Sequence, residues 1–102
     1  MSFPSDRQLE LFVHKTAKDS SNVVFTRHAR QRMRLRHIND PMVFEVLRMG
    51  RFTFPPEPGV AHMALICRLQ RFVAGKEVAV VVNLEYPESD LIVVTVIDVG
   101  RG

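Results

Sequence analysis

The residues best suited to chemistry lie in one short segment, Arg27 to Ile38, which holds five arginines, two histidines and no carboxylate. His28 and Arg32 are four residues apart, so one turn of a helix places them side by side. An imidazole transfers protons near neutral pH, and a guanidinium binds a phosphate through two parallel N–H donors. Cleavage of RNA needs both functions, because protons move at the 2′- and 5′-oxygens while negative charge grows on the phosphate.

A third residue, Arg36, continues this series. On a helix that turns about 100° per residue, His28, Arg32 and Arg36 fall within an arc of roughly 80°, next to Ala29 and Met33. We therefore expect the three side chains to face partly inward, with His28 as general acid or base, Arg32 on a phosphate and Arg36 as a second phosphate contact. The alternative is a structural role, in which His28 donates a hydrogen bond to the backbone and the two arginines pair with carboxylates such as Glu45, Glu85 or Asp98.

Other basic residues extend the predicted RNA-binding surface. Arg27, Arg30 and Arg34 take the outer side of the same helix, where they either follow a nucleic-acid backbone or form an ordinary solvated face. Arg68 lies on the more polar side of a predicted strand and can reach a bound phosphate, unless it is only a surface residue. Thr95 is the one hydroxyl in an apolar strand, and threonine is also a common strand former.

Metal and thiol chemistry are not expected. His14, His28, His37 and His62 belong to different predicted elements, and no set of three or four ligands converges, so we predict neither a metal site nor a cofactor. Cys67 is the only cysteine and lies in an apolar alternation, where burial raises the pKa of a thiol. We therefore interpret Cys67 as a small buried hydrophobic residue in a reducing compartment.

The first half of the chain contains the helical signals. Ser5 and Gln8 form a capping-box pattern ahead of a helix predicted from about 6 to 18. Val23–Phe25 suits a short strand, after which Thr26 caps the arginine-rich helix. A third helix is predicted from Asn39, its cap, to Gly50, its stop.

The second half changes to the two-residue period of strands. Residues 54–59, rich in proline, predict a stiff connector that continues no helix or central strand. Alternation then predicts strands over 63–70 and 78–85, and a third, central strand over 91–99 that is apolar on both faces. Helices followed by a meander predict an α+β fold, with N-terminal helices packed on a C-terminal antiparallel β-meander and a site on the opposite sheet face.

Length and composition fit one domain spanning residues 1–102. Hydrophobic residues make up 46% of the 102 residues and charged residues 25%, which is typical of globular proteins. We find no signal peptide or membrane span, so the expected compartment is the cytoplasm. Residues 1–54 carry ten Lys/Arg and five Asp/Glu, whereas residues 55–102 carry four and six, so the basic charge lies on the helical half. A basic surface of this kind favours a polyanionic partner.

The chain also resembles a bacterial domain-of-unknown-function family numbered 4258. The resemblance covers residues 23–98 and leaves 1–22 as an N-terminal helix extension. The residues that match the pattern of the family are Thr26-Arg27-His28-Ala29, Arg32-Met33, Arg36, Ile38, Val46-Leu47, Gly50, Gly75, Val80 to Val82 and Thr95. Ile97 departs from it, because the family has an aromatic residue there.

The resemblance implies the fold of small bacterial ribonucleases, including toxins of toxin–antitoxin systems that cleave messenger RNA. It makes His28, Arg32 and Thr95 the active-site candidates, and it implies RNA as a partner, with an antitoxin or another protein as a second one. Our leading hypothesis is a metal-independent endoribonuclease of single-stranded RNA. The alternatives are a non-catalytic module that binds RNA or protein through the arginine-rich helix, and a structural or partner-regulating module.

Overall fold

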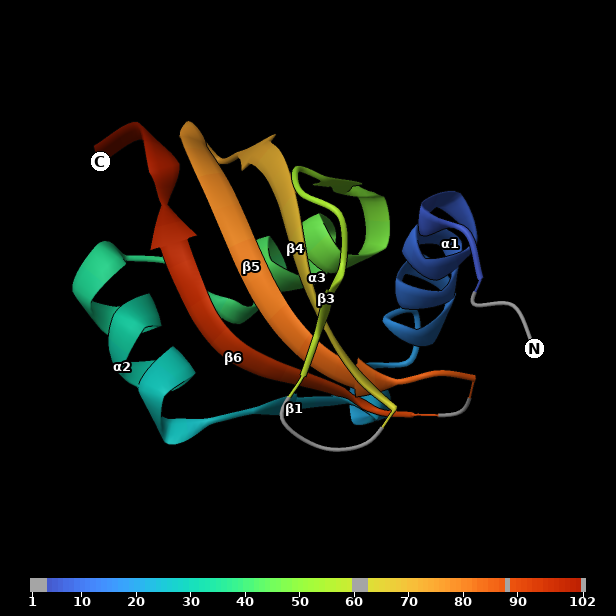
Figure 1. Ribbon diagram of the computed structural model, residues 1–102. Coiled ribbons are helices and arrows are strands. Elements are labelled where there is room, and N and C mark those ends of the chain that lie inside the picture. The colour runs from blue at the N-terminus through green and yellow to red at the C-terminus, as the bar shows by residue number, and fades with distance from the viewer. Residues whose placement is uncertain (1–3, 60–62, 88, 102) are drawn as a thin grey trace.

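The computed structural model describes residues 4–59, 63–87 and 89–101, and Figure 1 shows their arrangement. Helices come first along this part of the chain and long strands follow, which confirms the predicted α+β class. The elements are α1 (Asp6–Thr16), η1 (Ser20–Asn22), β1 (Val23–Phe25), α2 (Arg27–Arg36), α3 (Asp40–Met49), β2 (Arg51–Phe52), β3 (Glu57–Pro58), β4 (Ala64–Val73), β5 (Lys76–Glu85), β6 (Leu91–Asp98) and η2 (Val99–Arg101). None of the helices in these ranges is long and apolar enough to span a membrane.

The three α-helices begin at the residues that the sequence predicts. Ser5 and Gln8 form a complete capping box, and the side chains of Thr26 and Asn39 each accept a backbone N–H in the first turn of the helix that follows. The first helix ends at Thr16, slightly earlier than predicted. Gly50 does end α3, but its backbone is extended rather than left-handed. Glycine fits there because a Cβ atom would collide with the Val46 carbonyl oxygen.

The sheet is mixed, so the prediction of a purely antiparallel meander is incomplete. Strands β4, β5 and β6 form the predicted antiparallel meander, and the full order is β1-β6-β5-β4-β2, with β3 also paired to β4. Strand β1 joins β6 in parallel, with Val23 opposite Leu91. A three-residue strand carries no signal for its partner or direction, and this pairing is set by where α2 and α3 return the chain.

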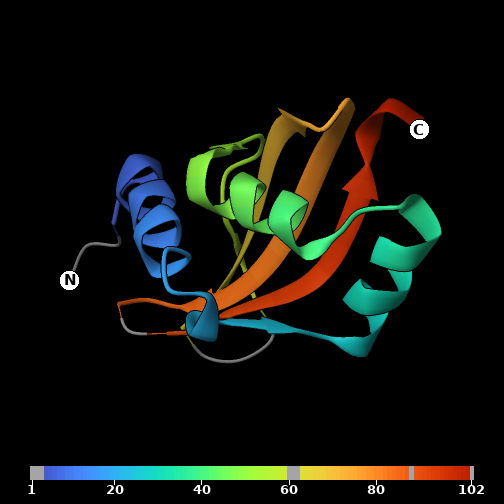
Figure 2. The ribbon, with the colours of Figure 1, turned by 180° about the vertical axis from the view of Figure 1, so that it is seen from behind.

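In the described part of the chain, helices cover one face of the sheet. Figure 1 shows α3 behind the long strands with α1 at the side of the sheet, and the reverse view in Figure 2 shows α3 in front of the strands. The hydrophobic core lies between these layers and includes Val43, Leu47, Leu69 and Val80. Helix α2 packs beside β6 at the end of the sheet. The opposite surface of the strands, which we call the open face, carries no helix among the described residues.

A β-bulge decides which side chains of β6 reach the open face. Val82 pairs with Val93, but Val81 pairs with Thr95, so Val94 is an extra residue in β6. Side chains alternate along a strand, and an uninterrupted β6 would send Val93 and Thr95 to the same side. Because of the bulge, Val93 is fully buried in the core and Thr95 lies on the open face, only partly buried.

Thr26 joins the end of β1, the start of α2 and the bulge of β6. Its backbone N–H donates to the Val93 carbonyl at 3.2 Å, and its hydroxyl lies 2.9 Å from that carbonyl and 3.2 Å from that of Val94. The same hydroxyl accepts the Ala29 N–H at 3.1 Å. One side chain therefore holds the arginine-rich helix against the strand that carries Thr95.

We predict that Thr26→Ala lowers the free energy of unfolding by about 1–2 kcal/mol, because it removes a helix cap together with a bond to β6. Urea denaturation followed by circular dichroism measures this loss. The matched control is Thr53→Ala at an exposed threonine, for which the expected change is within about 0.5 kcal/mol. Equal losses in the two variants would show that Thr26 does not form the junction described here.

Candidate functional site

His28 and Arg32 form a side-chain pair on α2. The Nε of Arg32 donates to the Nε2 of His28 at 3.4 Å, so this ring nitrogen acts as an acceptor. His28 is exposed and Arg32 is partly buried. The expectation that His28 faces inward is therefore wrong: the buried side of α2 centres on Ala29 and Met33, and His28 lies about 100° away from Ala29 around the helix.

Arg36 points further inward than the other two residues of this series. It lines a hollow of about 100 Å³ together with Leu35, His37, Lys76 and Asp98. Within the described chain its Nε is buried and has no hydrogen-bond partner. Leaving such a donor unpaired costs roughly 1–3 kcal/mol.

The carboxylates named in the structural alternative have other partners or are exposed. Glu45 pairs with Arg71 at 3.1 Å, and Asp98 lies 3.9 Å from the amine of Lys76. Glu85 is exposed at the end of β5. Over residues 4–59, 63–87 and 89–101, no ion pair joins Arg32 or Arg36 to a carboxylate. The guanidinium of Arg32 therefore keeps its charge available to an anion, whereas Arg36 shares its hollow with the carboxylate of Asp98.

The arginines on the outer side of α2 differ in their contacts. Arg30 pairs with Asp40 at 2.5 Å, and its guanidinium lies 3.9 Å from the centroid of the Phe25 ring. Arg27 and Arg34 are exposed. Of the three residues predicted to follow a nucleic-acid backbone, Arg30 thus also fastens α2 to α3 and β1.

Arg68 and Thr95 share one row across the open face. Arg68 of β4 pairs with Val81 of β5, and Val81 pairs with Thr95 of β6. Paired residues project to the same side of a sheet, and two strand spacings separate Arg68 from Thr95 by roughly 10 Å. The structure thus brings together two predicted site residues that are 27 positions apart in the sequence. The His28–Arg32 pair lies on α2, the helix that packs beside β6.

Sequence reasoning missed Phe54, an aromatic residue beside Arg68. The guanidinium carbon of Arg68 lies 5.1 Å from the centroid of the Phe54 ring, and Phe54 remains 56% exposed. The two side chains help to line a hollow of about 180 Å³ on the open face. A signal was present in the sequence, because an aromatic residue directly before Pro55-Pro56 is held on a stiff segment.

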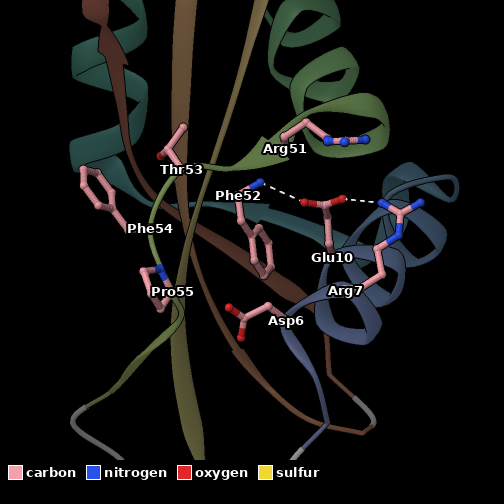
Figure 3. A pocket seen from close by; sticks show the side chains of 8 residues that line it. All are labelled: Asp6, Arg7, Glu10, Arg51, Phe52, Thr53, Phe54 and Pro55. Atoms are coloured by element: carbon pink, nitrogen blue, oxygen red, sulfur yellow. Dashed lines mark hydrogen bonds and ion pairs between the residues drawn. The ribbon is translucent and has the colours of Figure 1, made fainter.

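A larger hollow, of about 450 Å³, lies between α1 and β2 and is drawn in Figure 3. Its most buried charged group is Glu10, which is 7% exposed and was not singled out from the sequence. One oxygen of Glu10 accepts from Arg7 at 2.6 Å, and the other accepts the Phe52 N–H at 2.9 Å. Both oxygens are satisfied, so Glu10 fastens the first helix to the sheet edge rather than awaiting a ligand.

The described residues also bear on metal and thiol chemistry. No three His, Cys, Asp or Glu side chains within these ranges are grouped so that they could hold a metal ion, and His62 lies outside the described residues. Cys67 is fully buried, as predicted, and burial raises the pKa of its thiol to about 12. A thiol in that state is a poor nucleophile at neutral pH.

Comparison with known proteins identifies the family. The family described as "Domain of unknown function (DUF4258)" matches residues 25–98. This range runs from the end of β1 to the end of β6, and it includes α2 and the whole row from Arg68 to Thr95. No curated protein and no solved structure matches the chain.

We predict that Cys67 of the folded protein does not react with Ellman's reagent between pH 7 and pH 9, because the buried thiol holds its proton up to about pH 12. Absorbance of the released thiolate measures the reaction. The same protein in 6 M guanidinium chloride is the control and should react completely. Rapid labelling of the folded protein at pH 7 would contradict the burial of this side chain.

Proposed function

The chain belongs to the DUF4258 family, and from the geometry of its own residues we propose that it is a metal-independent endoribonuclease that cleaves single-stranded RNA. The observation that carries the proposal is the His28–Arg32 pair. It combines a proton-transfer group and a phosphate-binding group at 3.4 Å, and no carboxylate neutralises it within the described chain. Both groups are at least partly accessible to a large substrate.

In the proposed reaction, His28 acts as general base. It takes the proton of a 2′-hydroxyl, whose oxygen attacks the adjacent phosphorus. The bond from phosphorus to the 5′-oxygen breaks, this oxygen takes a proton from water, and the imidazolium returns its proton to the hydroxide that remains. The products are a 2′,3′-cyclic phosphate and a 5′-hydroxyl end. Arg32 binds the phosphate oxygens and stabilises the charge that grows on them, with Arg36 as the second cation.

The open face offers a path for the rest of the RNA. Thr95 lies on β6, beside which α2 packs, and its hydroxyl supplies a hydrogen-bond donor there. Arg68 continues the path on β4, which is separated from β6 by β5. The exposed Arg27 and Arg34 supply phosphate contacts on the outer side of α2. We propose that the enzyme acts on RNA in the cytoplasm and that a protein antitoxin restrains it.

A second candidate is RNA binding without cleavage. The observation that favours it is the exposure of His28, because general bases usually act in sites that exclude water. In this case the basic side chains of α2 would only hold the phosphate backbone. The two functions predict different fates for the bound RNA.

We predict that the purified protein cleaves a single-stranded RNA in the presence of EDTA, and that His28→Ala reduces the rate at least about 100-fold, because a positioned general base contributes about 10²–10⁴. Gel analysis of a 5′-labelled RNA measures the rate, and Gln31→Ala, at an exposed position of the same helix, is the matched control. Arg32→Lys should give a smaller loss, because charge remains while the two parallel donors are lost. Cleavage by His28→Ala at the rate of the wild type would remove the role assigned to His28.

We predict further that RNA binding weakens as salt is raised, and that Arg27→Ala and Arg34→Ala each reduce the slope of log K against log salt by about 0.7, the value for one phosphate contact on a single strand. Fluorescence anisotropy with an RNA that carries 2′-O-methyl groups, which block cleavage, measures the slope. Lys15→Ala on the exposed side of α1 is the control and should leave the slope unchanged. An affinity indifferent to salt would contradict RNA binding by α2.

A further inference from the structure

The hollow beside Arg68 is built by an unusual connection along one edge of the sheet. Phe52 pairs with Leu69, and Glu57 pairs with Ile66. Two residues of β4 separate these pairs, whereas the opposite segment, 53–56, has four. We call this segment the arch, and in Figure 1 the chain leading into β3 passes in front of β4, on the open face. Its two prolines restrict the backbone, so the arch is stiff.

The arch encloses an apolar space with one charged group at each side. The hollow is lined by Phe54, Pro55, Ile66 and Val81, together with Arg68 and Glu57. Glu57 is the pairing partner of Ile66, so the two project to the same side of the sheet. No ion pair joins Glu57 to Arg68 within the described residues, and the buried Nε of Arg68 has no hydrogen-bond partner there. Both charged groups are available to a ligand.

This lining suits a nucleobase better than a phosphate. A phosphate would be repelled by the carboxylate of Glu57 and would leave the apolar walls without a contact. A base has two apolar faces and polar edges, and unpaired bases of RNA are commonly bound beside aromatic and arginine side chains. The hollow therefore fits a flat, apolar group that presents acceptors to Arg68 and donors to Glu57.

Guanine is the base that meets both requirements with paired groups. Its O6 and N7 are neighbouring acceptors that suit the forked donors of an arginine, and its N1–H and N2–H₂ are neighbouring donors that suit a carboxylate. Adenine and cytosine each offer one amino group, so neither presents two neighbouring donors to the carboxylate. We propose that the hollow under the arch binds one unpaired guanine base. The inference rests on the proposed function for its choice of RNA as the ligand, and it adds the base that the enzyme recognises.

The test uses binding rather than cleavage. Hexamers of 2′-O-methyl uridine, with a single guanine, adenine or cytosine at the third position, are titrated with the wild-type protein in EDTA and followed by fluorescence anisotropy. We expect the guanine hexamer to bind about tenfold more tightly than the others, because one bidentate pair discriminates against the wrong base by about that factor. Glu57→Gln should reduce the preference to less than twofold, whereas Glu85→Gln, at an exposed carboxylate of β5, should keep it.

Two further results separate this inference from the proposed function. Phe54→Leu removes the aromatic wall at an exposed position and should weaken guanine binding without loss of folding. Equal binding of the three hexamers, or a preference that survives Glu57→Gln, would overturn the guanine site even if RNA cleavage depends on His28. A guanine preference in a protein that cleaves no RNA would instead overturn only the proposed nuclease.

Discussion

The arrangement of the site depends on the junction made by Thr26. This residue ends β1, caps α2 and bonds to the carbonyls of Val93 and Val94 in β6. A helix with five arginines and no carboxylate has no ion pair between its own side chains, and only its narrow side around Ala29 and Met33 is buried. The hydroxyl bond, that narrow contact and the pairing of Arg30 with Asp40 therefore position the charged side chains relative to the sheet.

The same region contains the irregularity that brings Thr95 to the open face. The extra residue Val94 shifts the alternation of β6, so that Val93 stays in the core while Thr95 emerges on the other side. Thr95 then shares a row with Arg68 through Val81. Core packing uses one face of the strands and leaves the other, with its arch, available for a ligand.

Local signals predicted the elements well. Caps at Ser5, Thr26 and Asn39 require only a side chain and the next turn of helix, and the long strands follow from a period of two. Non-local features were out of reach, because the parallel pairing of β1 and the bulge at Val94 depend on segments far apart in the chain. Helical periodicity also placed His28 too far inward. The periodicity gives the angle of each residue around the helix, but it does not tell how wide the buried side of the helix is.

The candidate site was predicted only in part, because contacts between distant segments bring some of its residues together. Residue type and spacing identified His28 and Arg32, which the structure brings to 3.4 Å. Phe54 and Glu57 were missed because their importance comes from an arch that is visible only once β2 and β3 are both paired to β4. A short edge strand next to prolines looks like a plain connector in the sequence.

We propose that the His28–Arg32 pair and the open face around Thr95 receive one RNA strand together. The most direct measurement is a two-dimensional NMR titration of the isotopically labelled protein with a 2′-O-methyl oligonucleotide, following the backbone amides of α2, β6 and the arch. We predict that His28, Arg32, Thr95 and Phe54 shift together, with one common dissociation constant. Shifts confined to Arg27 and Arg34 on the outer side of α2, with Thr95 and Phe54 unchanged, would contradict the account.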